Sequence, residues 1–311
     1  MRSAPNPTRA IALKLASVTA FVAMASLIKA TSDAVPPGQA VFFRSFFAMF
    51  VIVGWLAARG SLRTGLKVAD PMSHVWRGLV GTTAMGLMFT GLGLLPLPEV
   101  TAIGYAAPLL VVILAAMFLG EQVRFFRLSA VALGLLGVLI VLSPRLTALE
   151  GGATDRELLG AVVVLAGAAG AALAQVFVRK MVETEETSAI VFWFSITSTV
   201  LSLLTLPYGW QVPSADVAGM LILAGLLGGL GQIGLTAAYR YADAGVVAPF
   251  DYFSMLLALL VGYFVFGEVP TLTVLGGASL VILAGILIIW RERQLGLERT
   301  RQRETTQQKG L

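Results

Sequence analysis

A single arginine, Arg44, lies in the run PPGQAVFFRSFFAMFVIVGW, among aromatic, aliphatic and small residues. Its guanidinium group stays charged and binds carboxylates, phosphates and carbonyl oxygens through as many as five N–H donors. Within a membrane such a charge costs about 2.5–3.5 kcal/mol at a helix centre, so it usually faces the protein interior or a wet cavity. Ala40 and Ala48 leave room one turn to either side. We therefore expect Arg44 to line a cavity and bind an anionic or carbonyl group; snorkelling or a structural ion pair is the alternative.

Asp251, in the stretch APFDYFSM, is a second charged residue in an apolar region. Pro249 removes a backbone donor and can unwind the helix locally, and Pro108 is similarly placed in an earlier apolar segment. Unwound helices expose carbonyl groups that can hold a ligand. Among Pro249, Phe250 and Phe253 a carboxyl group would be held more easily in its protonated form, so we expect Asp251 to exchange protons. A carboxylate that reaches water at the membrane interface is the alternative.

Further side chains within apolar segments could hydrogen-bond to a ligand or stack on it. The predicted binding residues are Arg44, Tyr105, Asp251 and Tyr252, with Gln175, Trp193 and Gln232 as additions. Neither a catalytic residue nor a metal site or cofactor is predicted, since the chain has no cysteine and one histidine, His74, which we expect in a solvated loop.

The acidic residues near segment ends are expected to have structural or solvated positions. Glu183, Glu185 and Glu186 form a cluster typical of a solvated face. Glu121 and Glu268 follow glycines where apolar segments end, and are expected to accept hydrogen bonds from free N–H groups at the start of the next helix.

The glycines of GGLGQIG match the spacing of a dinucleotide-binding loop, with Gly229, Gly231 and Gly234 at the required positions. Such a loop needs a preceding strand in a βαβ unit, whereas these glycines lie in an apolar segment. Gly225 and Gly229 instead form a GxxxG pattern, and Ala166, Gly170 and Ala174 a similar stripe. We expect close helix packing or cavity lining at both places. No Walker sequence is present, so the chain itself is not expected to hydrolyse ATP.

The elements that position these residues are membrane-spanning helices. Of the 311 residues 57% are hydrophobic and 13% charged, a membrane composition. We expect Lys14 and Lys29 in the first span to reach the two interfaces by snorkelling. The predicted spans are 10–30, 38–58, 75–95, 100–119, 126–143, 157–179, 188–207, 216–240, 245–266 and 272–290.

The basic residues predict the orientation, because cytoplasmic loops collect lysine and arginine. With both termini in the cytoplasm, most basic residues, Arg77 among them, fall in or beside cytoplasmic segments. The net charge of +5 is then a consequence of topology, and no nucleic-acid partner is predicted.

The chain repeats itself. GLVG at 78–81 recurs as GLLG at 225–228, and FLGE at 118–121 recurs at the same separation as VFGE at 265–268. Tyr105 corresponds to Tyr252, and Arg44 approximately to Phe194. With five spans in each half, the second repeat enters the membrane from the opposite side. The predicted fold is an all-α membrane protein with ten transmembrane helices as two inverted five-helix repeats, an architecture typical of secondary transporters.

The predicted divisions follow from this repeat. They are a cytoplasmic N-terminal segment (1–9), the first repeat (10–143), an external link (144–156), the second repeat (157–290) and a cytoplasmic basic tail (291–311).

The segment RGLVG…LPLPEVTAIGYAAPLLVVILAAMFLGE, its counterpart ending in VFGE, and FFRSFF resemble the drug/metabolite transporter superfamily, specifically its ten-span EamA-type members. PPGQAVFFRSFFA and WRGLVG further resemble riboflavin-transporter-like members. The resemblance implies a central cavity, lipid-bilayer localisation in the cell inner membrane, and transport of a small organic substrate such as an amino-acid-, nucleotide- or vitamin-like metabolite. Movement by alternating access, with possible proton coupling, is expected. A polytopic membrane enzyme and a channel are the alternatives.

Overall fold

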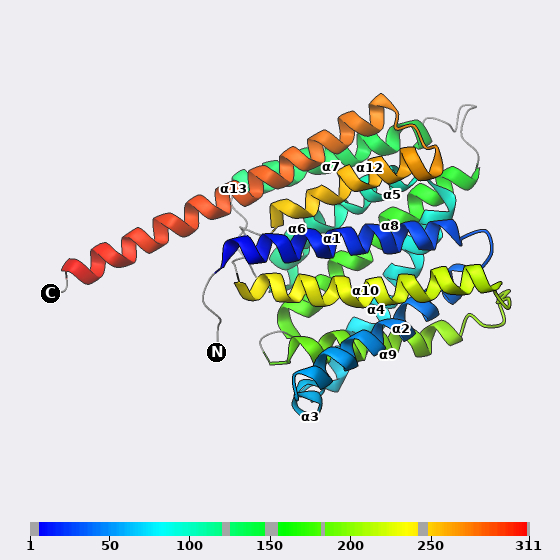
Figure 1. Ribbon diagram of the computed structural model, residues 1–311. Helices are drawn as coiled ribbons and strands as arrows, with labels where there is room; N and C mark the ends of the chain where they lie inside the picture. The colour runs from blue at the N-terminus through cyan, green and yellow to red at the C-terminus, as the bar shows by residue number, and fades with distance from the viewer. Residues whose placement is uncertain (1–5, 120–124, 147–154, 182–183, 242–247, 310–311) are drawn as a thin grey trace.

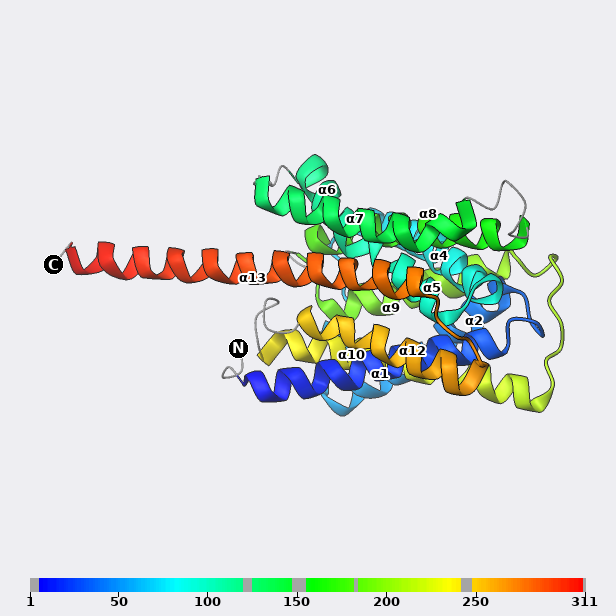
Figure 2. The same ribbon diagram turned by 90° about the horizontal axis from the view of Figure 1, so that it is seen from above.

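The computed structural model describes residues 6–119, 125–146, 155–181, 184–241 and 248–309. Within these ranges every regular element is a helix, which confirms the predicted all-α class. The helices lie side by side in one bundle, and α1 begins at the end of the bundle beyond which α13 extends (Figures 1 and 2). In chain order they are α1 (Pro7–Ala30), α2 (Pro37–Ala58), α3 (Leu62–Gly65), α4 (Pro71–Leu94), α5 (Leu97–Gly104), α6 (Ala106–Leu119), α7 (Phe125–Leu146), α8 (Asp155–Met181), α9 (Thr187–Leu203), α10 (Ala215–Tyr241), the 3-10 helix η2 (Ala248–Tyr252), α12 (Phe253–Phe266) and α13 (Leu272–Lys309).

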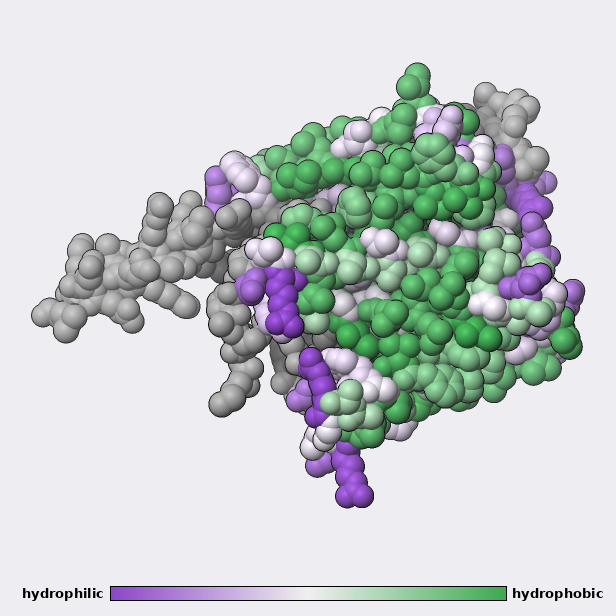
Figure 3. All heavy atoms as spheres, viewed as in Figure 1, coloured by the Kyte–Doolittle hydropathy of each residue, from purple (hydrophilic) through white to green (hydrophobic). Residues whose placement is uncertain are grey.

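Five helical segments of the described chain are long and apolar enough to cross a membrane. They are Thr8–Ala30, Pro37–Ala58, Leu97–Phe118, Asp155–Val178 and Ala215–Leu235. Shorter apolar helices cover Leu128–Pro144, Thr187–Leu203, Phe250–Phe266 and Leu272–Ile288. Apolar side chains cover most of the visible face of the bundle, with hydrophilic residues gathered towards its ends (Figure 3). The chain is therefore a multi-helix membrane protein, and the count of ten spans stays a prediction.

Several helices begin at a proline, and two of them, α1 and α4, also have a side-chain cap. Pro7, Pro37 and Pro71 each occupy the first turn, where a missing N–H group leaves no helical bond unmade. Asp70 caps α4, because its Oδ1 accepts from the backbone N–H groups of Met72 and Ser73 at 3.1 and 3.4 Å.

Two predicted spans are interrupted at corresponding positions. The fourth breaks at Tyr105, between α5 and α6, three residues before Pro108. The ninth begins as the 3-10 helix η2, which contains Pro249 and ends at Tyr252 before α12 starts. The expected local unwinding near both prolines is therefore present. Helix α9 ends at Leu203, four residues before the predicted end of its span, because the chain turns there. Helix α13 continues to Lys309, and its apolar part, Leu272–Ile288, agrees with the predicted span 272–290.

The helices pair across the two halves of the chain. The most extensive contacts join α1 to α10, α4 to α8, and α7 to α13, and α2 also packs on α9. At the α7–α13 crossing, a Cβ on Gly137 would lie 2.7 Å from the carbonyl oxygen of Gly277, so the backbones approach closely. In α10 a Cβ on Gly225 would lie 2.6 Å from Cβ of Phe47, which confirms helix packing as the role of that GxxxG glycine.

Candidate functional site

Arg44 lies inside the bundle, as expected. It belongs to α2, its exposed fraction is 6%, and its ζ carbon lies 6.0 Å from the ring centroid of Phe194 on α9. Phe194 is also its approximate counterpart in the repeat, so the two halves of the chain meet here. On its other side Nε lies close to Gly228 of α10, where an added Cβ would be 3.2 Å away.

Arg77 reaches the same ring from α4. Its ζ carbon lies 3.9 Å from the Phe194 centroid, within the range of a cation–π interaction. The guanidinium group occupies the space beside Gly81, because a Cβ there would collide with Nη1 of Arg77 and with the Phe194 ring. Arg77 was predicted only as a cytoplasmic topology marker, and its position beside Arg44 is new.

The two guanidinium groups are positioned by matching glycines in the middle of their helices. Gly81 and Gly228 are the final glycines of the repeated GLVG and GLLG sequences. Gly81 lies near the centre of Pro71–Leu94, and Gly228 near the centre of Ala215–Tyr241. Both charges are consequently held at mid-height in the bundle.

Several buried polar side-chain atoms of α2 and α4 lack a hydrogen-bond partner among the described residues. The buried atoms without one are Nε of Arg44, Oγ of Ser45, both ring nitrogens of His74, and Nε and Nη1 of Arg77. All belong to α2 or α4. The ion pairs of the described chain are Lys14–Asp251, Lys29–Glu268 and His74–Glu185, so none includes Arg44 or Arg77.

Tyr105 and Tyr252 meet at the two helix breaks. Their ring centroids are 5.3 Å apart at an interplanar angle of 55°. The hydroxyl of Tyr105 donates to the carbonyl oxygen of Asp251 at 3.2 Å and also shares a hydrogen bond with Ser254. The Tyr252 side chain fills the space left by Gly285 of α13, where a Cβ would collide with it. Three predicted binding residues therefore form one cluster.

Asp251 has different surroundings from those expected. Its Oδ1 lies 2.5 Å from Nζ of Lys14, and its side chain is 47% exposed, so an apolar pocket around the carboxylate is wrong. Lys14 is 2% exposed and does not snorkel to an interface. The ion pair with Asp251 compensates the charge of the buried lysine.

An ion pair at the other end of α1 joins the two halves of the chain. Nζ of Lys29 lies 2.9 Å from Oε1 of Glu268, whose Oε2 accepts from the backbone N–H of Leu97 at 2.8 Å. Glu268 was expected to cap the helix that follows it, but it caps α5 instead, because the bundle brings the start of α5 nearer. Its counterpart Glu121 lies outside the described residues.

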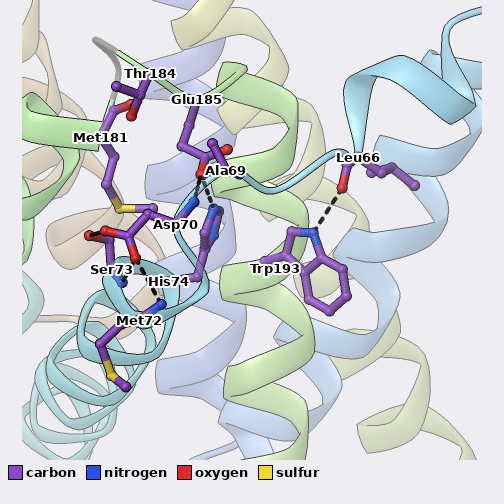
Figure 4. A network of polar contacts seen from close by, with 10 residues as sticks. All are labelled: Leu66, Ala69, Asp70, Met72, Ser73, His74, Met181, Thr184, Glu185 and Trp193. Atoms are coloured by element: carbon purple, nitrogen blue, oxygen red, sulfur yellow. Dashed lines mark hydrogen bonds and ion pairs between the residues drawn. The ribbon is translucent and has the colours of Figure 1, made fainter.

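Glu185 and His74 form a buried network near the start of α4 (Figure 4). Oε1 of Glu185 accepts from the backbone N–H groups of Ala69 and Asp70 at 2.7 and 2.8 Å, and lies 3.4 Å from Nε2 of His74. Both side chains are buried, so the predictions of a solvated histidine and a solvated Glu185 are wrong. The N–H groups of Ala69 and Asp70, just before α4, need a hydrogen-bond acceptor, and the Glu185 carboxylate provides it.

The other predicted residues have surroundings of their own. Nε1 of Trp193 donates to the carbonyl oxygen of Leu66 at 3.1 Å (Figure 4), and its ring lines a hollow of about 440 Å³ between α4 and α9. Gln232 lines a small pocket with Trp55, and Gln175 is exposed on α8.

Residues 8–143 and 158–291 both match the model of the EamA-like transporter family. The chain belongs to this family. The resemblance predicted from the repeated motifs is therefore confirmed, and this EamA-like protein is a transporter whose relatives move small molecules.

Curated relatives of this EamA-like transporter have several substrates. The S-adenosylmethionine uptake transporter of Rickettsia felis is 28% identical over 82% of this chain and 84% of its own length. The riboflavin transporter of Rhizobium johnstonii is 29% identical over 93% and 94%, and the pseudopaline exporter of Pseudomonas aeruginosa 28% over 88% and 93%. A solved structure with 19% identity superimposes with a TM-score of 0.64, covering 91% of this chain and 98% of the other, which shows a shared fold.

Sequence reasoning did not bring Arg77 and Phe194 together with Arg44 in this EamA-like transporter. One signal was available, since Arg77 precedes the repeated glycine motif by one residue and Gly81 lies one helical turn further on. The direction of a long side chain along its helix, and the ring it meets, depend on how α4 and α9 pack.

Proposed function

We propose that this protein is a secondary transporter of a small organic metabolite in the bacterial inner membrane. It works by alternating access, without ATP hydrolysis, and both its termini face the cytoplasm. Arg44, Tyr105, Asp251 and Tyr252 are its proposed substrate-binding residues.

The contact between the two interrupted spans carries this proposal. Tyr105 and Tyr252 occupy corresponding places in the repeat, each at a helix break, and their rings are 5.3 Å apart. Secondary transporters place their substrate sites near the membrane midplane, where interrupted helices of two repeats meet. A change in the angle between the repeats would open this contact to one side of the membrane or the other.

The names of the relatives supply the first substrates to test. Purified protein in liposomes preloaded with riboflavin or S-adenosylmethionine should accumulate the same labelled compound from a dilute external solution. Such counterflow requires a carrier that exposes its site alternately. Flux that equalises concentrations without transient accumulation would assign the protein to the channels.

The tyrosine contact can be tested with a matched pair of variants. Tyr105→Phe removes the hydrogen bonds to Asp251 and Ser254 while keeping the ring, and should slow counterflow about tenfold. Tyr263→Phe is the control, because Tyr263 is 53% exposed on α12. Equal counterflow in both variants would remove Tyr105 from the transport path.

Proton coupling through Asp251 is a separate part of the proposal. The carboxylate is 47% exposed and paired with the buried Lys14, so its charge is linked to the packing of α1 against this part of the bundle. Asp251→Asn should abolish accumulation driven by an imposed pH difference while retaining measurable substrate exchange. Its melting temperature is compared with that of wild type, because Lys14 loses its counter-charge in this variant. Unchanged pH-driven uptake in this variant would eliminate Asp251 as the proton carrier.

A further inference from the structure

We propose that the substrate of this transporter is a small organic dianion, held by Arg44 and Arg77 against the ring of Phe194. The inference rests on the proposed transport function and narrows it to one chemical class. It adds Arg77 and Phe194 to the binding site.

The charges of Arg44 and Arg77 come from two neighbouring helices. Arg44 comes from α2 and Arg77 from α4, which are consecutive long helices joined through α3 at one end of the bundle (Figure 1). Each lies about 9–11 Å along its helix from the first residue, at 1.5 Å per residue, and the two helices run in opposite directions. The two side chains therefore approach the middle of the bundle from opposite ends.

The positive charges of Arg44 and Arg77 are not balanced by acidic residues of the described chain. Both ζ carbons lie within 6.0 Å of one ring centroid, so the two positive charges repel each other in a medium of low dielectric constant. Buried charges are ordinarily paired, as Lys14 and Lys29 are in this protein. Neither arginine has an acidic partner in the described parts of the chain. A bound anion would supply the missing charge.

The guanidinium groups of Arg44 and Arg77 have N–H donors without acceptors in the described chain. Nε of Arg44 and both Nε and Nη1 of Arg77 are buried without a hydrogen-bond acceptor among the described residues. In each arginine Nε belongs, with Nη2, to the edge of the guanidinium group that matches the oxygen spacing of a carboxylate or phosphate, and binding through two parallel hydrogen bonds is strong. Two such edges fit a substrate with two negative charges better than one with a single charge.

Phe194 and the repeated glycines keep the two donors in place without neutralising them. The ring attracts each cation through its quadrupole and carries no net charge. Gly81 and Gly228 leave space for the two guanidinium groups, and a methyl group at either glycine would press on an arginine. The site is thus built for two permanent cations, with the anionic component left to a ligand.

Ligand charge can be tested with compounds of nearly equal size. Thermal unfolding of the purified protein should shift upward with glutarate, 2-oxoglutarate or glycerol 3-phosphate, each measured against sodium chloride of equal ionic strength. Monomethyl glutarate, which has one charge fewer, should give a much smaller shift than glutarate. The carboxylate and phosphate compounds separate the two chemical sources of a dianion.

The arginines are tested by Arg44→Gln and Arg77→Gln, each expected to weaken dianion binding about tenfold or more. Arg59→Gln is the matched control, because Arg59 is exposed beside Trp55 and should leave binding unchanged. Melting temperature without ligand reports folding. If a glutamine variant unfolds, the corresponding lysine variant retains the charge, and should bind more weakly than wild type and melt near its temperature.

The outcomes separate this inference from the proposed function. Stabilisation by a dianion that is lost in both arginine variants supports the inference. Binding of no tested dianion, or equal binding in wild type and variants, overturns it. Counterflow of riboflavin or S-adenosylmethionine without any dianion binding would support transport and refute the dianion site. Dianion binding without counterflow of any compound would support the dianion site and refute transport.

Discussion

The ammonium group of Lys29 is stabilised inside the bundle by three oxygens. It donates to the carbonyl groups of Leu92 and Leu95 at 3.1 and 2.7 Å, and lies 2.9 Å from Oε1 of Glu268. Arg44 is as deeply buried and has no comparable partner among the described residues. The contrast separates a charge that links elements of the fold from one that is available to a ligand.

Removing the acidic partner of Lys29 should therefore destabilise the protein. Glu268→Gln leaves a mostly buried ammonium group without its counter-charge, at a cost of about 2–4 kcal/mol in the free energy of unfolding. Denaturant unfolding in detergent measures the change. The control is Asp33→Asn, at an exposed residue of the loop after α1; similar losses in the two variants would contradict a specific role for the Lys29–Glu268 pair.

Asp70, in the loop before α4, should make the stability of the folded protein depend on pH. The hydrogen bond donated by the Ser73 hydroxyl, followed by the N–H groups at the start of α4, holds the pKa of Asp70 below its usual value. A carboxylate with a lowered pKa in the folded state stabilises it above the unfolded value of about 3.9, and this stabilisation is lost as pH falls through the folded value.

The measurement compares Asp70→Ser with Asp70→Ala and wild type. Serine can cap α4 without a titrating group, so its melting temperature should exceed that of the alanine variant at every pH. The advantage of wild type over serine should shrink as pH falls below about 4. An advantage that grows on acidification would contradict the sign of the shift.

Among the elements, α7 and α13 depend on glycine for their packing. A Cβ on Gly277 would lie 2.6 Å from the carbonyl oxygen of Gly137 and 3.0 Å from the backbone nitrogen of Val141. Both neighbours are backbone atoms, which cannot change rotamer to make space. The crossing of these helices, one from each matched segment, is therefore specified by two small residues.

Gly277→Ala should separate α7 from α13 and lower the free energy of unfolding by about 1–3 kcal/mol. Gly276→Ala is a control one residue away, with no atom within 4 Å of the added Cβ. This variant should be neutral or slightly stabilising, because alanine favours a helix over glycine by about 1 kcal/mol. Equal thermal stability of the two variants would rule out a close crossing.

At the scale of the whole molecule, the two family matches are arranged as interlocked halves. Helix α1 of the first half packs on α10 of the second, and α4 of the first on α8 of the second. The candidate binding residues also meet across the two halves, since Arg44 approaches Phe194 and Tyr105 approaches Tyr252. An inverted arrangement of the halves would explain both kinds of pairing.

Topology provides the test of that arrangement. With both termini in the cytoplasm and ten spans, the link at 150–155 must face the outside of the cell. The chain has no cysteine, so single cysteines can be introduced at these positions and near residue 300 and labelled with a membrane-impermeant reagent. Labelling of 150–155 from the cytoplasmic side would refute the inverted five-plus-five model.

The sequence by itself determined the all-α membrane class, the family and the internal repeat. The length of the apolar segments, the placement of basic residues and the repeated glycine motifs can be read along the chain. They indicate which segments lie in lipid and which in water. The buried position of Arg44 was also predictable, because a permanent charge within a membrane segment avoids lipid.

Only the tertiary structure decided which charges are paired. Lys14 and Asp251 are far apart in the chain, and their ion pair exists because α1 lies beside the start of the ninth predicted span. Arg77 could equally have extended towards water, but the space at Gly81 and the face of Phe194 direct it inward. Whether a charge is compensated depends on atoms that other helices bring within a few ångströms, and spacing along a single chain does not contain that information.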